Sequence, residues 1–346
     1  VKQMSKENRT GIGFFLFNRS HRLLYAKAFG FYEDEDGEHS FSGIESLPAG
    51  SSSLWVTSIL ILRLVDKGRI KLSHTTGDLL DWEGKGSDIT LKSLLNMTSG
   101  LPGRSHFFSC LNALTMDVQE CSNEIKKSID HNKIPVKKQG SSFSYGPSHF
   151  TLAVAMAEKA TEKKWSDLVK EELVQPLNLS LNTRYYTQPV EKNGDMNPSP
   201  FDGLVISMRD YIQVLKALVS SESKYLSSPM MRQSMTLQFK QNTEILASPM
   251  KTLLEKNYSF GLGHWLECEP EISSSPTSSQ SCEELNLLSC PGVFGWYPFI
   301  DINQGYYGLL AALEGHGPSE KSVEPALRSW RILKEIRQLL KDWKVN

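Results

Sequence analysis

The sequence has no excess of charge, no long hydrophobic run and no recognisable cofactor motif. Its 38 Lys and Arg residues are balanced by 39 Asp and Glu residues, and a net charge of −1 gives no reason to expect binding to nucleic acid or to an anionic membrane. The longest apolar run, from Leu54 to Val65, is too short to span a bilayer and contains Arg63. No residue spacing typical of a metal site and no glycine-rich phosphate loop is present, so we expect neither a metal nor a cofactor.

The composition is that of an ordinary folded protein. Of the 346 residues, 39% are hydrophobic and 22% are charged, which is enough apolar material for one large domain or two domains of medium size. The chain begins at Val1 without the pattern of a secretion signal, as we expect of a processed or trimmed product.

Cysteine is scarce, and its five positions fall in two stretches of the sequence. The first two are close enough for a local bridge, and a second bridge is expected among the last three, which leaves one cysteine free or paired between chains. Scattered buried thiols are the alternative that this spacing leaves open. The disulfide candidates are Cys110, Cys121, Cys268, Cys282 and Cys290.

Five asparagines stand in the N-x-[ST] pattern of glycosylation acceptors, which is more than the composition would give by chance. Together with disulfides, these acceptors favour the secretory pathway and an extracellular or luminal location. The candidate acceptors are Asn8, Asn18, Asn96, Asn178 and Asn257.

A long buried helix is predicted around the apolar run. Gly50 is followed by three serines, whose side-chain oxygens are expected to cap the first turn of this helix. Between Leu54 and Val65 only three residues are polar, and Gly68 provides a C-terminal stop.

The two ends of the chain predict strands and a helix. Gly11–Phe17 and Leu23–Phe29 have the length and pattern of a β-hairpin, and Tyr306–Leu313 predicts a further strand. An amphipathic helix is expected from about Glu324 to Trp343. The region from His106 to Lys138 shows no clear pattern and is expected to be an irregular insert.

Several stretches of the chain resemble the motifs of one family. The predicted helix and Leu64–Leu72 after it resemble an S-x-x-K helix with an L-V-x-x-G-x-[LI]-x-L continuation, and Ile89–Pro102 resembles I-T-[IV]-x-x-L-L-x-H-T-S-G-L. Phe143–Pro147 and Ser289–Trp296 stand where relatives have Y-[SA]-N and [HK]-[ST]-G-G-x-x-G-[FW]. The family is that of the serine β-lactamases and penicillin-binding proteins, including class C β-lactamases and the related D-alanyl-D-alanine carboxypeptidases and esterases.

The resemblance assigns the family's catalytic positions to residues that cannot all perform the chemistry. Ser51 takes the position of the nucleophile, and Tyr145 takes that of the motif tyrosine. The lysine that would accept the serine proton is replaced by Leu54, and Pro147 stands in place of the asparagine. The triplet that would carry the second cation is replaced by Ser289, Cys290 and Pro291.

Three other residues are candidates for the missing chemistry. His149 lies one helical turn beyond Tyr145, and His264 lies in a strand-like segment, although a lone histidine is more often a packing or surface residue. Cys290 is conceivable as a nucleophile, but a disulfide is its favoured state. Without a substitute base, a tyrosine hydroxyl with the ordinary pKa of about 10 accepts a proton poorly at neutral pH.

The fold implied by the resemblance is α+β, an α/β sandwich in which helices flank an antiparallel sheet, with a mostly helical subdomain. The whole chain, 1–346, would form a single β-lactamase-like domain. Its α/β part is expected at about 1–60 and 255–346, and its helical part at about 61–254.

The implied function is that of a catalytically inactive relative with a binding or structural role. Its partner would be an unknown protein or assembly, or a small ligand or peptide in the former cleft. The alternative is a weak or rewired serine hydrolase, an esterase, amidase or peptidase that acts through an acyl–Ser51 intermediate. A titratable base within hydrogen-bond reach of the Ser51 hydroxyl would distinguish the two, and we expect none.

Overall fold

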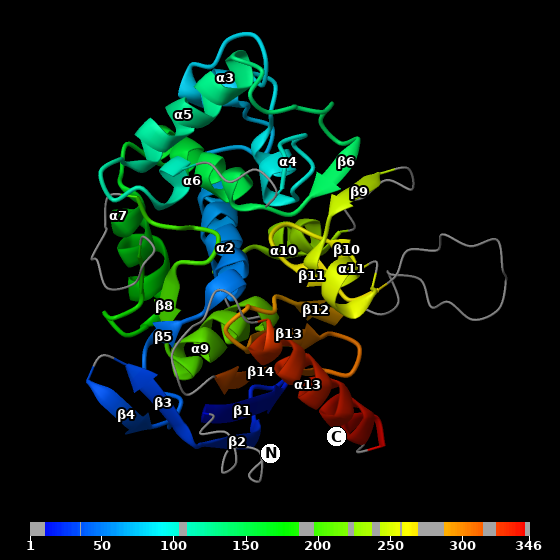
Figure 1. Cartoon of the computed structure of the whole chain (residues 1–346). Helices are drawn as coiled ribbons and strands as arrows, with labels where there is room; N and C mark the ends of the chain where they lie inside the picture. Colours follow the sequence, from blue (N-terminus) through cyan, green and yellow to red (C-terminus); the bar gives the residue numbers. More distant parts are fainter. Residues whose placement is uncertain are drawn as a thin grey trace, which may run out of the picture.

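A seven-stranded antiparallel sheet is the largest sheet of the computed structural model, which describes residues 11–34, 36–103, 109–186, 197–220, 225–236, 243–256, 258–268, 287–313 and 323–342 (Figure 1). The strand order is β10-β11-β12-β13-β14-β1-β2, so segments from both ends of the described chain form one sheet. The α+β fold and the N-terminal hairpin predicted from the sequence are therefore confirmed. The strands are β1 Gly11–Asn18, β2 Leu23–Phe29, β10 Ser259–Phe260, β11 Trp265–Leu266, β12 Leu287–Ser289, β13 Trp296–Asp301 and β14 Tyr306–Leu313.

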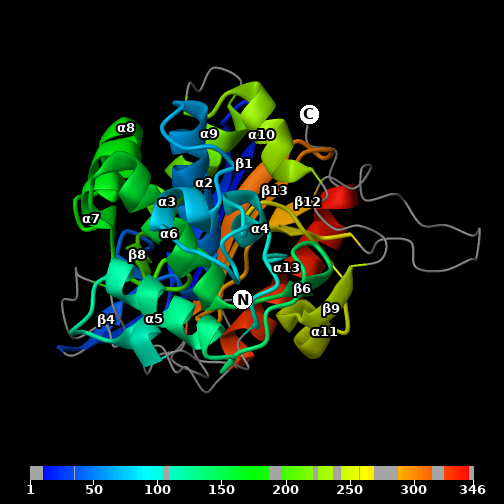
Figure 2. The same ribbon diagram turned by 90° about the horizontal axis from the view of Figure 1, so that it is seen from above.

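Helices cover both faces of the sheet. On β1, Ile12 and Leu16 pack in the cluster that includes α13 (Glu324–Asp342), whereas Phe15 packs against the main core on the side of α9 (Met208–Val219). This alternation follows from the period of two in a strand, which sends successive side chains to opposite faces. Figure 2 shows the sheet from above, with α13 running beside α11 (Pro249–Leu254) at one border of the molecule.

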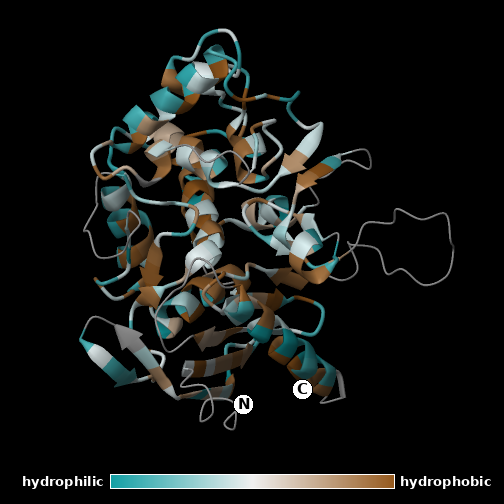
Figure 3. Ribbon diagram, viewed as in Figure 1, coloured by the Kyte–Doolittle hydropathy of each residue, from teal (hydrophilic) through white to brown (hydrophobic). Residues whose placement is uncertain are grey.

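Helix α2 (Ser53–Asp66) runs through the interior between the sheet and the remaining helices (Figure 1). Every residue from Ser53 to Leu62 is buried, as expected of a helix that is apolar almost all round (Figure 3). Gly68 ends the helix as predicted, with φ of 69° and its N–H bonded to the Val65 carbonyl. In the ranges that the structure describes, no helix combines the length and the apolar character needed to cross a bilayer.

The chain between β2 and β10 is mostly helical, with short strands at its borders. Its helices are η1 Gly50–Ser52, α2, α3 Thr76–Leu80, α4 Leu91–Leu95, η2 Ser109–Asn112, α5 Val118–Asp130, α6 Pro147–Thr161, α7 Trp165–Val169, η3 Lys170–Val174, α8 Gln175–Leu177, α9, α10 Ser228–Met235 and α11. Its strands are β3 Phe31–Asp34, β4 Gly37–Ser40, β5 Leu47–Pro48, β6 Ser142–Ser144, β7 Arg184–Tyr185, β8 Leu204–Ile206 and β9 Glu244–Ala247.

The region predicted to be an irregular insert contains a regular helix, α5. Asp117 accepts a hydrogen bond from the Glu120 N–H, and the Glu120 carboxylate accepts one from the Asp117 N–H. This reciprocal capping box is a sequence signal for a helix start that the motif comparison overlooked. Cys121 on α5 forms a disulfide with Cys110, which confirms the first predicted bridge.

The remaining cysteines are described only in part. Cys268 is disulfide-bonded and Cys282 lies outside the described residues, so the predicted pairing among the last three cysteines stays a prediction. Cys290 is a free, buried thiol, so the disulfide favoured for it from the sequence is wrong.

Candidate functional site

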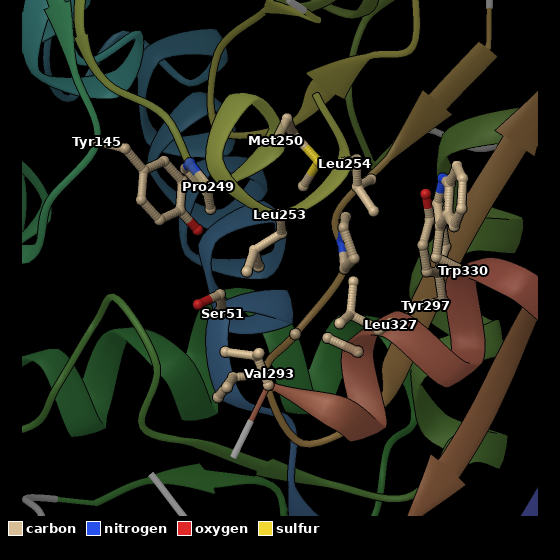
Figure 4. Close-up of a pocket in the computed structure, with 14 residues that line it drawn as sticks. Ser51, Tyr145, Pro249, Met250, Leu253, Leu254, Val293, Tyr297, Leu327 and Trp330 are labelled. Atoms are coloured by element: carbon tan, nitrogen blue, oxygen red, sulfur yellow. The ribbon is translucent and has the colours of Figure 1, made fainter. Parts of the chain in front are cut away.

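A pocket with a cavity volume of about 70 Å³, partly open to solvent, lies where η1, α11 and α13 approach one another (Figure 4). Ser51 and Tyr145 lie at one end of it, and Tyr297 and Trp330 lie at the other. The described residues that line it are Ser51, Tyr145, Pro249, Met250, Leu253, Leu254, Pro291, Gly292, Val293, Tyr297, Val323, Ala326, Leu327 and Trp330. Three of the sequence-predicted positions, Ser51, Tyr145 and Pro291, are thus brought together in one cavity.

Ser51 lies in η1, the short turn that leads into α2. The expected capping role of the three serines is wrong, because no side chain caps the first turn of α2. Two of the hydroxyls instead donate hydrogen bonds to backbone carbonyls. Ser52 donates to the Cys290 carbonyl at 2.6 Å, and Ser53 donates to the Gly50 carbonyl at 2.6 Å. Among the described residues, no group forms a hydrogen bond with the Ser51 hydroxyl, and this serine is only 6% exposed.

Tyr145 follows β6 and stands among aromatic rings. It stacks on Trp265 with ring centroids 5.6 Å apart and meets the edge of Phe201 at 5.1 Å. Figure 4 shows its hydroxyl end on the side of the ring that faces Ser51. Pro147 begins α6 at the first helical position, where its missing N–H costs nothing, and it does not line the pocket.

The segment from Ser289 to Gly292 passes close to the start of α2. A Cβ atom at Gly292 would lie 2.2 Å from the Ala49 carbonyl oxygen, so glycine is required for this approach. The Cys290 thiol donates to the Ser51 carbonyl at 3.2 Å and points away from solvent. Ser289 is buried beside it on β12, and its hydroxyl has no hydrogen-bond partner among the described residues.

Cys290 is not suited to act as a nucleophile. Burial raises the pKa of its thiol to about 12, so the reactive thiolate is absent near neutral pH. We expect the Cys290 thiol not to react with a disulfide reagent such as dithionitrobenzoate in the native protein, and to react in non-reducing denaturant. Cys290→Ala should lower the number of thiols that titrate in denaturant by one. A thiol that titrates in the native wild type and is lost in Cys290→Ala would contradict this placement.

The two histidines considered as substitute bases are both buried structural residues. The Nδ1 atom of His149 bonds to the Ser99 hydroxyl at 3.0 Å, and its Nε2 atom donates to the Ser144 carbonyl at 2.8 Å. His264 stacks on Trp55 with ring centroids 5.2 Å apart. Neither lines the pocket, and burial lowers the pKa of each to about 4.

Leu54 is fully buried on α2 and lies outside the pocket lining. None of the described lining residues is Lys, Arg, His, Asp or Glu, so this part of the chain offers no ammonium, imidazole or carboxylate in the pocket to take the proton from Ser51. Within the described part of the chain, no group of His, Cys, Asp and Glu residues could hold a metal ion.

The glycosylation candidates have different surroundings. Asn178 is exposed and Asn18 is half-buried, whereas Asn8 and Asn257 lie outside the described residues. Asn96 is 4% exposed, and its side-chain oxygen accepts from the Thr98 N–H and hydroxyl. This burial contradicts a glycan at Asn96 in the folded chain.

The apolar walls of the pocket are the part of the site that motif comparison missed. The wall formed by α11 has no counterpart among the motifs, and Tyr297 lies within a strand. The apolar side of α13 was detectable from its periodicity, but the structure divides it: Leu327 and Trp330 line the pocket, while Leu333 packs against the sheet.

The fold and the site together define a protein of the serine β-lactamase and penicillin-binding-protein type. The family model described as Beta-lactamase matches residues 1–306, and the chain belongs to this family. Protein flp of Staphylococcus aureus (strain MW2) is 22% identical over 173 residues, which are 49% of this chain and 34% of that protein, so the chain spans about a third of that relative's length.

Solved structures support the same fold at low sequence identity. The octameric penicillin-binding protein homologue from Pyrococcus abyssi has a TM-score of 0.66 and 18% identity, over 96% of this chain and 75% of that one. The penicillin binding protein from Bacillus halodurans has a TM-score of 0.67 and 13% identity, over 96% of this chain and 98% of that one. At these identities the likeness carries the architecture and not the activity.

Proposed function

We infer that this chain is a non-catalytic member of the β-lactamase family and that its former active-site cleft serves binding. The observation that supports this inference is the pocket itself, in which the described lining residues place no lysine, histidine or carboxylate beside Ser51. An unassisted serine hydroxyl is a poor nucleophile, and loss of one member of a catalytic unit already removes most of its rate. A ligand or peptide in the cleft, or a partner protein in an assembly, would then be the biological target.

The proposed setting is the secretory pathway, with the protein luminal or extracellular. The Cys110–Cys121 disulfide and the bonded state of Cys268 support this, because disulfides persist in oxidising compartments. The exposed acceptor Asn178 is compatible with a glycoprotein.

A weak or rewired serine hydrolase is the second candidate. It is favoured by one observation, which is that Ser51 and Tyr145 still line the same pocket. In this reaction the Ser51 oxygen would bond to the acyl carbon, the leaving group would depart with a proton, and water would later release the acid. The proton on Ser51 would need an acceptor, and among the described lining residues Tyr145 is the one whose side-chain oxygen lies at that end.

Covalent labelling separates the two candidates. We expect the folded protein to remain unlabelled by a fluorophosphonate and by a fluorescent penicillin, as measured by intact mass after prolonged incubation. An active serine β-lactamase is the positive control for both reagents. Labelling that is present in the wild type and absent in Ser51→Ala would overturn the non-catalytic proposal and establish an acyl–Ser51 chemistry.

A further inference from the structure

The pocket has a distinct chemical character, because almost all of its lining is hydrocarbon. Apart from Ser51, Tyr145 and Tyr297, the lining residues are aliphatic or aromatic apolar side chains, prolines and one glycine. The Tyr297 hydroxyl is engaged outside the pocket, where it donates to the Glu267 carboxylate at 2.9 Å. Tyr297 therefore presents its ring to the pocket, and the hydroxyls of Ser51 and Tyr145 lie at the end away from the Trp330 indole (Figure 4).

The described lining residues carry no charged side chain, which restricts what can bind. A carboxylate or ammonium group that entered this pocket would lose hydration without gaining a counterion from these residues, which is strongly unfavourable. An uncharged molecule with a hydrocarbon part avoids this penalty and gains from burial of its apolar surface.

We propose that the pocket binds an uncharged ligand with an aliphatic chain, whose polar end meets the Ser51 hydroxyl and whose chain lies between α11 and α13 toward Trp330. The proposal rests on the non-catalytic function inferred above, because a ligand held beside an unactivated serine stays intact. It assigns each wall a role: Leu253 and Leu254 contact the chain from α11, and Ala326 and Leu327 contact it from α13.

A matched pair of competitors tests the ligand class. The uncharged fluorophore N-phenyl-1-naphthylamine serves as the probe, and 1-decanol and decanoate compete for its site at pH 8. These competitors share a chain length and differ in charge. We expect 1-decanol to displace the probe at a concentration at least about tenfold lower than decanoate, because only decanoate must bury a charge. Equal potency, or tighter binding of decanoate, would overturn the proposal.

A matched pair of variants on one helix tests the location. Leu327→Asp puts a carboxylate into the pocket, whereas Leu339→Asp puts one on the same helix at a position that is 70% exposed. We expect Leu327→Asp to weaken probe binding by at least about tenfold and Leu339→Asp to leave it unchanged. Circular dichroism and thermal melting establish that both variants are folded. An equal effect of the two variants would place the probe elsewhere and refute the site.

Ser51→Ala tests the polar end. We expect this variant to weaken 1-decanol about threefold to tenfold, which is the loss of one hydrogen bond, after correction for any change in probe affinity. No change would refute the assigned orientation. Loss of probe binding with increasing protein concentration, together with dimerisation in sedimentation, would show that a second copy covers the pocket and would overturn the proposal. These binding outcomes are independent of covalent labelling, which tests the non-catalytic function.

Discussion

Replacement of Glu267 by leucine is expected to lower the free energy of unfolding by about 3–5 kcal/mol. The Glu267 carboxylate accepts from Arg337 Nη1 at 2.7 Å and from the Tyr297 hydroxyl at 2.9 Å, and the side chains of Glu267 and Arg337 are 3% and 14% exposed. Removal of the carboxylate leaves a guanidinium buried against Tyr297 and Phe299 without a counterion. Arg337 lies on α13, so the variant should loosen this helix from the sheet.

The double variant Glu267→Leu/Arg337→Met distinguishes a lost ion pair from lost packing. Replacement of both charges by apolar side chains removes the unpaired ion, and we expect the double variant to be within about 1 kcal/mol of the wild type. Glu324→Ala is the control on the same helix, since the Glu324–Arg331 pair is 45% and 58% exposed and should contribute less than about 1 kcal/mol.

Urea unfolding measures each of these free energies, and unchanged m-values would show that the extent of unfolding is the same. A double variant as unstable as Glu267→Leu alone would refute the electrostatic explanation. Because Tyr297 and α13 also form pocket walls, Glu267→Leu should weaken binding of N-phenyl-1-naphthylamine as well.

Individual elements could be predicted from the sequence because their signals are local, whereas their arrangement as an α+β fold came from the resemblance to the family. The strand period of β1, the apolar run of α2 and the positive-φ glycine at position 68 each constrain a short segment without reference to the rest of the chain. The same local reasoning located the Cys110–Cys121 bridge. It failed for α5 only because the capping box at Asp117 was not considered.

The site could be predicted only in part from the sequence, because its walls come from segments that are distant in sequence. Motif spacing placed Ser51 and Tyr145, but the pocket is completed by α11 and α13, whose apolar residues look like ordinary core residues in the sequence. The role of the Ser52 hydroxyl was also set by a distant partner. Ser52 reaches Cys290, a contact that no local helix-capping rule could have given.

Acidification between pH 6.5 and about 4 is expected to destabilise the protein through two buried histidines. Burial lowers the pKa of His149 and of His264 to about 4, whereas an unfolded histidine has a pKa of about 6.5. Below pH 6.5 these two histidines become protonated in the unfolded chain, whereas in the folded chain they stay neutral down to about pH 4. The free energy of unfolding therefore falls as the pH falls. Each histidine should lower the free energy of unfolding by about 1.4 kcal/mol for each pH unit of acidification in this window, and should not affect it above pH 6.5.

The two histidines differ in what a substitution should reveal. Both His149 ring nitrogens are hydrogen-bonded, so its replacement also removes structural contacts. The His264 ring nitrogens have no hydrogen-bond partner of normal geometry among the described residues, and its ring stacks on Trp55. His264→Phe keeps the stacking and removes the titration, so it should be as stable as the wild type at pH 7.5 and more stable at pH 5.

Urea unfolding at pH 7.5, 6.5, 5.5 and 5.0 tests this pH dependence. These pH values lie above the pH at which protonation of Glu172 would reduce the free energy of unfolding. Burial raises the pKa of Glu172, but the hydrogen bonds from Lys67 and Arg63 outweigh this effect, so its pKa is lowered overall. Stabilisation by that carboxylate is lost only below its unfolded pKa of about 4.3. We expect the slope of unfolding free energy against pH to fall by about one proton in His264→Phe relative to the wild type. An unchanged slope in His264→Phe would mean that His264 takes up a proton in the folded state as readily as in the unfolded chain, which its burial beside Trp55 opposes.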